Sequence, residues 1–228
     1  MWTSLVAIVL GLLAFLVFGI YLGVPVICKI LDYRKFIKHL DGTDGVYLTF
    51  DDGPCPEGTP LVLDALNNHG VKATFFVLAD KAREHPELID EMVFTGHQVA
   101  FHGRGHFHPW KTSPFKLWSN TSPSDFKKGS YFRPVFGKYS IFSLYFVKTR
   151  GICPVFWNLD PRDYEKIATP EIVAEKMFEE VVAGTVVLLH DGRVKDGLSS
   201  PSVTAEALKI FLDKRDPSLK FRRIDKGF

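Results

Sequence analysis

The chain has 228 residues, of which 46% are apolar and 24% are charged, and its formal net charge is +2. This length suits one domain of ordinary size or two small ones. The composition excludes collagen-like and low-complexity chains, which need an excess of Gly and Pro or a shortage of apolar residues, and the charge excludes nucleic-acid binding by bulk electrostatics.

The apolar residues are concentrated near the N-terminus. Residues 5–28 contain no charged side chain, and as a helix they would be about 36 Å long, enough to cross a hydrocarbon core of about 30 Å. A cleaved signal peptide would begin with a basic region, whereas this chain starts Met1-Trp2-Thr3-Ser4. A buried core helix would rarely be apolar on every face. We therefore predict that residues 1–28 form a single transmembrane anchor.

A basic stretch follows the anchor. Residues 29–45 contain Lys29, Arg34, Lys35 and Lys38, whereas no basic residue precedes the apolar segment. This asymmetry predicts that the rest of the chain faces the cytoplasm, and three cysteines are too few for an extracellular disulfide framework. The stretch itself is interpreted either as a solvated connector or as a short helix lying along the lipid headgroups.

From residue 46 to residue 228, short β-branched or aromatic runs alternate with longer mixed stretches, a pattern typical of a parallel α/β sheet or barrel. The stretch 110–129 contains two prolines and many small polar residues, and we predict a long loop there. Its aromatic residues Trp110, Phe115 and Trp118 either stack on a ligand, enter the membrane interface or cover the core. Strands are predicted at 46–50, 73–77, 97–101, 130–132, 155–159, 185–189 and 221–224, and helices at 59–69, 81–94, 139–150, 170–182 and 203–214.

Polar side chains follow most of the predicted strands. They are Asp51 and Asp52 after the first strand, His102 and His106 after the third, Arg133 after the fourth, Asp160 and Asp163 after the fifth, and His190 and Asp191 after the sixth. In parallel α/β folds the C-terminal ends of the strands are where ligands bind and catalysis occurs. We therefore expect these residues to form one site, although Asp-Gly-Pro alone is also an ordinary turn sequence.

The residue types in this set indicate a catalytic metal site. One carboxylate and two histidines four residues apart make a three-ligand set that leaves positions open for water and substrate. The second carboxylate is then free to act as a general base, and His190 can act as a general acid.

These residues resemble, in order along the chain, the five motifs of the polysaccharide deacetylases, the NodB-homology family (carbohydrate esterase family 4). The matching segments are Thr49–Pro54, His102–His106, Arg133–Gly137, Trp157–Tyr164 and Leu188–His190. The resemblance implies a distorted (β/α) barrel, one divalent metal ion, zinc or cobalt, and hydrolysis of an N-acyl group on an amino sugar.

The same resemblance implies a role for each matching residue. Asp51 would be the base, and Asp52, His102 and His106 would be the metal ligands. Arg133 would orient Asp51, the backbone N–H of Phe136 would hold the oxyanion, and His190, oriented by Asp163, would protonate the departing amine.

The chain departs from the family pattern at several positions. Gly103 stands where the family has Ser or Thr, Val135 and Phe136 replace Pro and Tyr, and Tyr164 replaces Trp. The stretch between His106 and Arg133, where the family has a helix, is short and interrupted by prolines, so we expect an altered substrate groove.

The anchor and the resemblance together predict a single-pass protein of the bacterial inner membrane with its catalytic domain in the cytoplasm. Its substrate would be an N-acetylated or N-formylated amino sugar. A domain held close to the bilayer favours a lipid-linked sugar. Members of the family commonly act outside the membrane, however, which favours a polymer such as peptidoglycan or an exopolysaccharide. A non-catalytic glycan-binding derivative is the alternative from another class.

Overall fold

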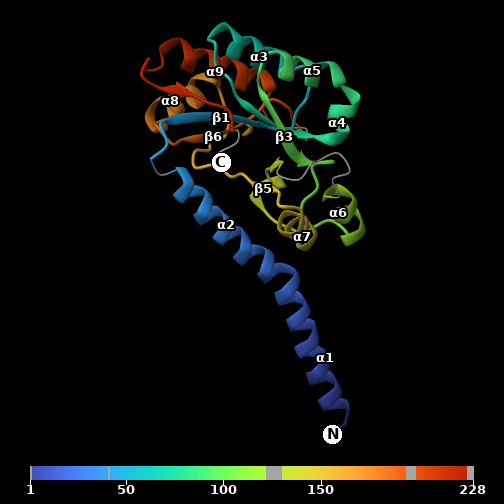
Figure 1. Cartoon of the computed structure of the whole chain (residues 1–228). Coiled ribbons are helices and arrows are strands. Elements are labelled where there is room, and N and C mark those ends of the chain that lie inside the picture. The colour runs from blue at the N-terminus through green and yellow to red at the C-terminus, as the bar shows by residue number, and fades with distance from the viewer. Residues whose placement is uncertain (1, 41, 122–129, 194–198, 225–228) are drawn as a thin grey trace.

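The chain begins with a helical rod that projects from a rounded domain (Figure 1). The computed structural model describes residues 2–40, 42–121, 130–193 and 199–224. The rod consists of α1 (Trp2–Phe18), a five-residue π-helical turn η1 (Gly19–Gly23) and α2 (Val24–Leu40). Taken as one continuous helix through these three elements, Ser4–Leu40 is long and apolar enough to cross a membrane.

The domain is built on a parallel sheet, as the sequence pattern predicts. The strand order is β5-β4-β3-β2-β1-β6, and β7 also pairs with β1. All the pairings are parallel, so the α/β fold class is confirmed. The strands are β1 (Gly45–Asp51), β2 (Thr74–Leu78), β3 (Gln98–Gly103), β4 (Tyr131–Phe132), β5 (Cys153–Pro154), β6 (Val186–His190) and β7 (Lys220–Phe221).

The fifth strand differs from its prediction. It covers Cys153–Pro154, and the predicted strand at 155–159 is mostly irregular backbone. Arg133 donates a hydrogen bond to the Phe156 carbonyl at 3.0 Å, which takes an acceptor away from strand pairing. Leu159 then forms an isolated β-bridge with Val187 of β6. The segment that follows β5, at one end of the strand order, therefore returns to β6 at the other end.

The helices begin where proline permits. Pro170 stands at the first position of α8 after Thr169, whose side chain accepts a hydrogen bond from Ile172 N. The predicted helix 81–94 is divided into α4 and α5 because Pro86 starts a new helix. The helices of the domain are α3 (Thr59–Asn68), α4 (Ala79–Glu84), α5 (Pro86–Phe94), α6 (Pro114–Thr121), α7 (Ile141–Arg150), α8 (Pro170–Glu180) and α9 (Pro201–Lys214).

Alternation along β1 separates an apolar face from a face that becomes polar at its end. Val46, Leu48 and Phe50 are buried in the first core cluster, together with residues of α3, α8 and α9. Successive strand residues point to opposite faces, so Thr49 and Asp51 lie on the other side. They are buried there, and this is where the polar site is built.

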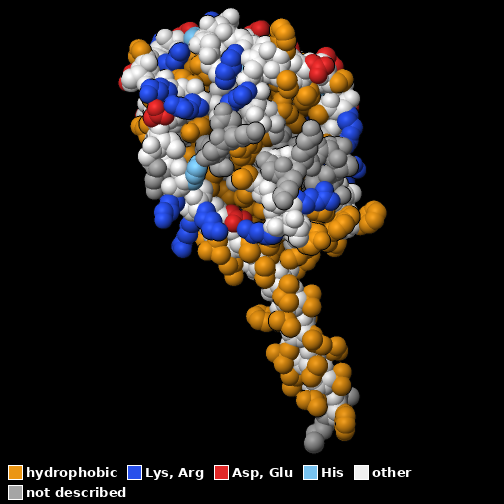
Figure 2. Space-filling model, in the orientation of Figure 1, with side chains coloured by type: hydrophobic (Ala, Val, Ile, Leu, Met, Phe, Trp, Pro, Cys, Tyr) orange, Lys and Arg blue, Asp and Glu red, His pale blue; other side chains and the backbone are white. Residues whose placement is uncertain are grey.

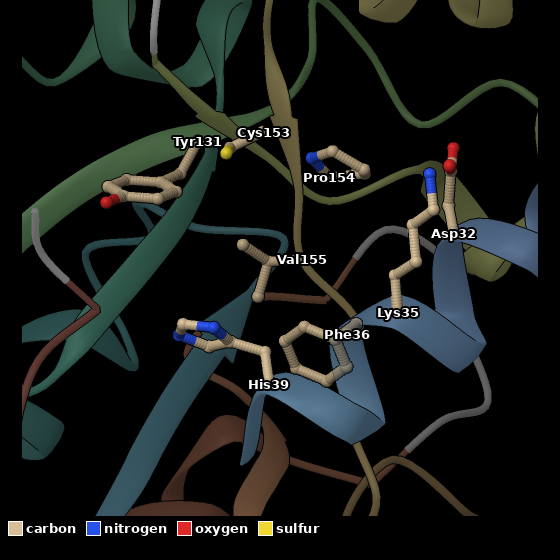
Figure 3. A pocket seen from close by; sticks show the side chains of 8 residues that line it. All are labelled: Asp32, Lys35, Phe36, His39, Tyr131, Cys153, Pro154 and Val155. Atoms are coloured by element: carbon tan, nitrogen blue, oxygen red, sulfur yellow. The ribbon is translucent and has the colours of Figure 1, made fainter. Parts of the chain in front are cut away.

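Helix α2 packs against the domain. Its Phe36 and Leu40 are buried in the second core cluster, and the rings of Tyr33 and Phe36 meet Phe156 edge to face at 5.7 and 5.9 Å. A pocket of about 270 Å³ remains between the helix and the β4–β5 edge of the sheet, and the side chains of Phe36 and His39 point into it (Figure 3). The basic residues after the apolar segment therefore lie on a helix, which ends at Leu40 and packs one side against the domain.

Asp32 connects α2 to the domain through polar contacts. It is buried, and it accepts hydrogen bonds from the Tyr139 hydroxyl at 3.0 Å and from Lys148 Nζ at 2.7 Å. We expect Asp32→Ala to reduce the free energy of unfolding by about 1–3 kcal/mol, because the buried Tyr139 hydroxyl loses its acceptor. Thermal unfolding of the detergent-solubilised full chain measures this change.

Asp44→Ala is the matched control. Asp44 also contacts two cations, Lys220 and Arg222, both at 2.9 Å, but all three side chains are exposed. Exposed ion pairs contribute little, so this variant should unfold close to the wild-type temperature. Equal losses in the two variants would contradict a specific role for Asp32 in holding the helix.

Candidate active site

The C-terminal ends of β1, β3 and β6 meet at one pocket. Asp51 and His190 are register partners on the adjacent strands β1 and β6, and β3 ends at Gly103, just after His102. The pocket has a volume of about 580 Å³. It is lined by Asp51, Asp52, His102, His106, Phe136, Lys138, Trp157, Asp160, Tyr164, Leu188, His190 and Arg193.

Asp52, His102 and His106 form a cluster that fits a metal ion. One ligand atom from each residue lies within 4.8 Å of the other two. Asp52 Oδ1 is buried without a hydrogen-bond partner in the part of the chain that the structure describes, and it faces the Nε2 atoms of His102 and His106 at 3.5 and 3.4 Å. A buried, unpaired carboxylate oxygen is costly unless a cation neutralises it. The donor set suits a divalent first-row metal.

Hydrogen bonding and burial prepare both histidines to act as ligands. His102 Nδ1 donates to the Arg133 carbonyl at 2.9 Å, which directs Nε2 towards the cluster. Burial lowers the pKa of His102 to about 3 and also lowers the pKa of His106. Both rings are therefore neutral near pH 7, which is the form that binds a metal.

Asp51 is held by a buried arginine. Arg133 is completely buried, and its Nη1 donates to Asp51 Oδ1 and to Thr49 Oγ1, each at 2.8 Å. The guanidinium also lies over the Phe76 ring, 4.2 Å from its centroid. Burial raises the pKa of Asp51, and Arg133 and His190 oppose this effect. A fixed carboxylate with increased proton affinity is suited to general-base catalysis.

His190 is paired with a buried carboxylate. Its Nδ1 donates to Asp163 Oδ1 at 2.8 Å, and its backbone N–H donates to Asp163 Oδ2 at 2.8 Å. Thr204 Oγ1 also donates to Asp163, at 2.6 Å. Burial by itself would lower the pKa of His190, but the Asp163 carboxylate raises it to about 9. The imidazole is therefore protonated at neutral pH and can donate a proton.

Phe136 lies at the rim of the pocket. It adopts a left-handed conformation (φ 57°) between Val135 and Gly137, and its half-exposed ring lies 4.5 Å from the His106 ring. Gly137 also has positive φ, and a Cβ there would approach the Trp157 ring to 2.7 Å. The turn thus brings its backbone beside the ligand cluster, and the role of the Phe136 N–H remains a prediction.

Comparison with known proteins confirms the family resemblance. The family model described as polysaccharide deacetylase matches residues 40–145. The chain is 35% identical to a chitooligosaccharide deacetylase of Sinorhizobium fredii, over 75% of this chain and 84% of the relative. The chain belongs to the polysaccharide deacetylase family.

Further relatives have the same domain. A peptidoglycan-N-acetylglucosamine deacetylase of Listeria monocytogenes is 34% identical over 64% of this chain and 32% of its own length. The crystal structure of the Bc1960 peptidoglycan N-acetylglucosamine deacetylase superposes with a TM-score of 0.68, covering 80% of this chain and 87% of that chain at 23% identity. This likeness confirms the expected NodB-type fold.

The structure brings the predicted catalytic and metal-ligand residues of this deacetylase together. Asp51, Asp52, His102, His106, Phe136 and His190 line the pocket, while Arg133 and Asp163 lie behind Asp51 and His190. Asp160 also lines the pocket, and Asp191 turns towards Thr59 instead. The catalytic and ligand roles themselves remain predictions.

Asn120 of α6 supports the loop between His102 and His106, a role that the sequence did not predict. Its Oδ1 accepts from Gly105 N at 2.6 Å and its carbonyl accepts from Arg104 N at 3.1 Å. The predicted loop at 110–129 is therefore wrong for 114–121, which form α6, and 122–129 lie outside the described residues. Gly103, where the family has Ser or Thr, has φ 142°, a conformation that needs glycine. Gly103 has no side chain that could support the ligand loop, and the support comes from Asn120 of α6 instead.

Proposed function

We propose that this carbohydrate N-deacetylase is metal-dependent and membrane-anchored, and that it removes an acetyl or formyl group from an amino sugar carried on a membrane lipid. The observation that carries the proposal is the position of a buried carboxylate, Asp51, and of the His190 imidazole, whose pKa Asp163 raises to about 9, at the same pocket as the candidate metal-ligand cluster. Hydrolysis of an amide needs both a base and an acid, because an amine is a poor leaving group until it is protonated.

Each residue has a defined task in this proposal. Asp52, His102 and His106 would hold a divalent metal ion, zinc or cobalt, which when bound polarises the carbonyl and activates water. Asp51 takes a proton from the attacking water. The Phe136 N–H donates to the developing oxyanion. His190 gives its proton to the nitrogen as the carbon–nitrogen bond breaks, which releases the carboxylic acid and the free amine.

The N-terminal rod supports attachment to a membrane. Residues 5–28 carry no charge, and the apolar side chains of α1 are exposed. The basic residues of α2 follow this segment, which favours a cytoplasmic domain on a bacterial inner membrane. A domain so placed would meet lipid-linked sugars before finished wall polymers. The second candidate is a polymer substrate, which is favoured by the names of the relatives from Sinorhizobium and Listeria.

Two measurements test the proposal. Reporter fusions at the C-terminus should report a cytoplasmic end. Purified full chain in vesicles, loaded with zinc or cobalt, should release acetate or formate from a polyprenyl-phosphate-linked N-acylglucosamine faster than from a chitooligosaccharide, and chelation should abolish the release. An external C-terminus with activity on polymer alone would overturn the lipid-linked assignment, and activity unaffected by chelation would overturn the metal.

A further inference from the structure

A continuous group of aromatic side chains is exposed on helices α6 and α7. Phe115 is 84% exposed, Trp118 45% and Tyr145 53%. The Trp118 ring lies 5.8 Å from Phe142 and 6.4 Å from Tyr145, and Phe115 is three residues before Trp118, on the same side of α6. We call Phe115, Trp118, Phe142 and Tyr145 the aromatic face. A soluble monomer seldom exposes a patch of this kind without a partner.

The charged residues of α6 and α7 are all positive, and one of them, Lys148, is paired with Asp32 of α2. Neither α6 nor α7 contains Asp or Glu, and Lys116, Lys148 and Arg150 accompany the aromatic residues. Lys116 lies over the Phe107 ring at 4.0 Å, and Arg150 lies over the Phe146 ring at 5.0 Å. Trp, Tyr and basic residues together are typical of the membrane–water interface, where the rings reach the headgroup level and cations meet anionic lipids.

The position of α7 places this face at the expected level of the bilayer surface. The 17 residues of α1 and the five of η1 would make a rod of about 33 Å, which crosses a hydrocarbon core of about 30 Å and ends near Gly23. Pro25, just beyond, is buried, and α2 contacts α7. Figure 1 shows α6 and α7 at the end of the domain nearest to α1, and apolar side chains gather at this end in Figure 2.

The aromatic face is also connected to the active site. Asn120, in the same helix as Phe115 and Trp118, binds the loop between the ligands His102 and His106. Trp110 lies in the same segment of the chain, where its Nε1 donates to the Tyr139 carbonyl at 3.3 Å and the pocket residue Lys138 lies over its ring at 4.7 Å. A contact between α6 and another surface would therefore lie close to the mouth of the pocket and would orient the domain there.

We propose that the aromatic face of α6 and α7 docks into the headgroup region of the phospholipid bilayer and orients the pocket towards sugars carried on lipids. This second contact rests on the proposed membrane attachment, and it goes beyond it: the anchor limits distance, whereas the docked face, together with the packed helix α2, sets orientation. The occupant is the lipid surface because the face lies at the end of the domain nearest to α1 (Figure 1), and because the charged residues of α6 and α7 are Lys and Arg alone.

Spin-label depth measurement on the full chain tests this directly. Cys28, Cys55 and Cys153 would be replaced by Ala, and a nitroxide attached at Phe115→Cys in vesicles of phosphatidylethanolamine and phosphatidylglycerol. The label should collide more with oxygen than with a water-soluble nickel chelate. Phe94→Cys is the matched control, because Phe94 is the last residue of α5 and is 91% exposed. Helix α5 lies on the side of the domain away from α1 (Figure 1). A label at 115 as accessible to nickel as the label at 94 would overturn the proposal, whether or not the enzyme is active.

An activity measurement provides the second arm. Phe115→Glu combined with Trp118→Glu should reduce turnover of the polyprenyl-phosphate-linked substrate in vesicles by about tenfold or more, since charges oppose insertion of the face. Hydrolysis of a soluble chitooligosaccharide should change by less than about twofold in the same variant. Equal losses on both substrates would contradict docking and assign α6 to structural support of the ligand loop. Phe94→Glu should leave both rates unchanged.

Discussion

Asp51→Asn should reduce the rate of deacetylation strongly while leaving the fold intact. Asparagine has nearly the shape of aspartate, and its carbonyl oxygen can still accept the hydrogen bond that Arg133 Nη1 donates to Asp51 Oδ1 at 2.8 Å. The amide has no oxygen basic enough to take a proton from water near pH 7. Loss of a general base reduces rates by about 10²–10⁴. Acetate release under metal-saturated conditions, measured as kcat/KM, gives this ratio.

Asp160→Asn is the matched control for this variant. Asp160 also lines the pocket, and burial raises its pKa as well, but it contacts Tyr164 and the Arg162 backbone rather than the buried arginine. We expect a much smaller loss than for Asp51→Asn. Metal content measured by plasma spectrometry should stay near one ion per chain in both variants. Similar activity losses in the two variants would refute the assignment of Asp51 as the base.

His190→Asn should separate amide from ester hydrolysis. The Asn side chain can still donate to Asp163, so the buried carboxylate keeps a partner, but no proton is available for the departing nitrogen. We expect N-deacetylation to fall by about 10²–10⁴. 4-Nitrophenyl acetate, whose leaving group needs no proton, should lose far less. Tyr164→Phe is the control, because its ring contacts His190 edge to face at 5.1 Å but carries no proton to the substrate. Equal losses on amide and ester would contradict the acid role.

The pH profile follows from the same pair. The acid works in its protonated form, and Asp163 raises the pKa of His190 to about 9, so N-deacetylation should persist through neutrality and decline as the pH rises through about 9. Asp163→Asn removes the stabilising charge and should move this alkaline limit to lower pH. An unchanged limit in Asp163→Asn would indicate that another group titrates there.

Local sequence rules were sufficient for much of the fold. Strand–helix alternation predicted a parallel sheet, and the predicted helix 170–182 begins at Pro170 as the structure confirms. Two predictions failed where a distant group acts on the backbone. The strand at 155–159 is interrupted where Arg133 takes the Phe156 carbonyl. The stretch at 114–121 is helical despite its composition, with Leu117 and Asn120 buried against the domain.

The residues of the site, the apolar segment and the family motifs could all be identified from the sequence, because each depends on residue type and short spacing. The contacts that support them could not be identified in this way. Three features depend on contacts between segments far apart in the sequence. Asn120 holds the ligand loop, Asp32 holds α2 to Tyr139, and aromatic residues of α6 and α7 share one exposed face. Such contacts form when the whole domain packs, and no local pattern in the sequence predicts them. Short motifs therefore specify the residues that carry the chemistry, whereas the orientation of the site relative to the anchor arises only when the helices and strands pack.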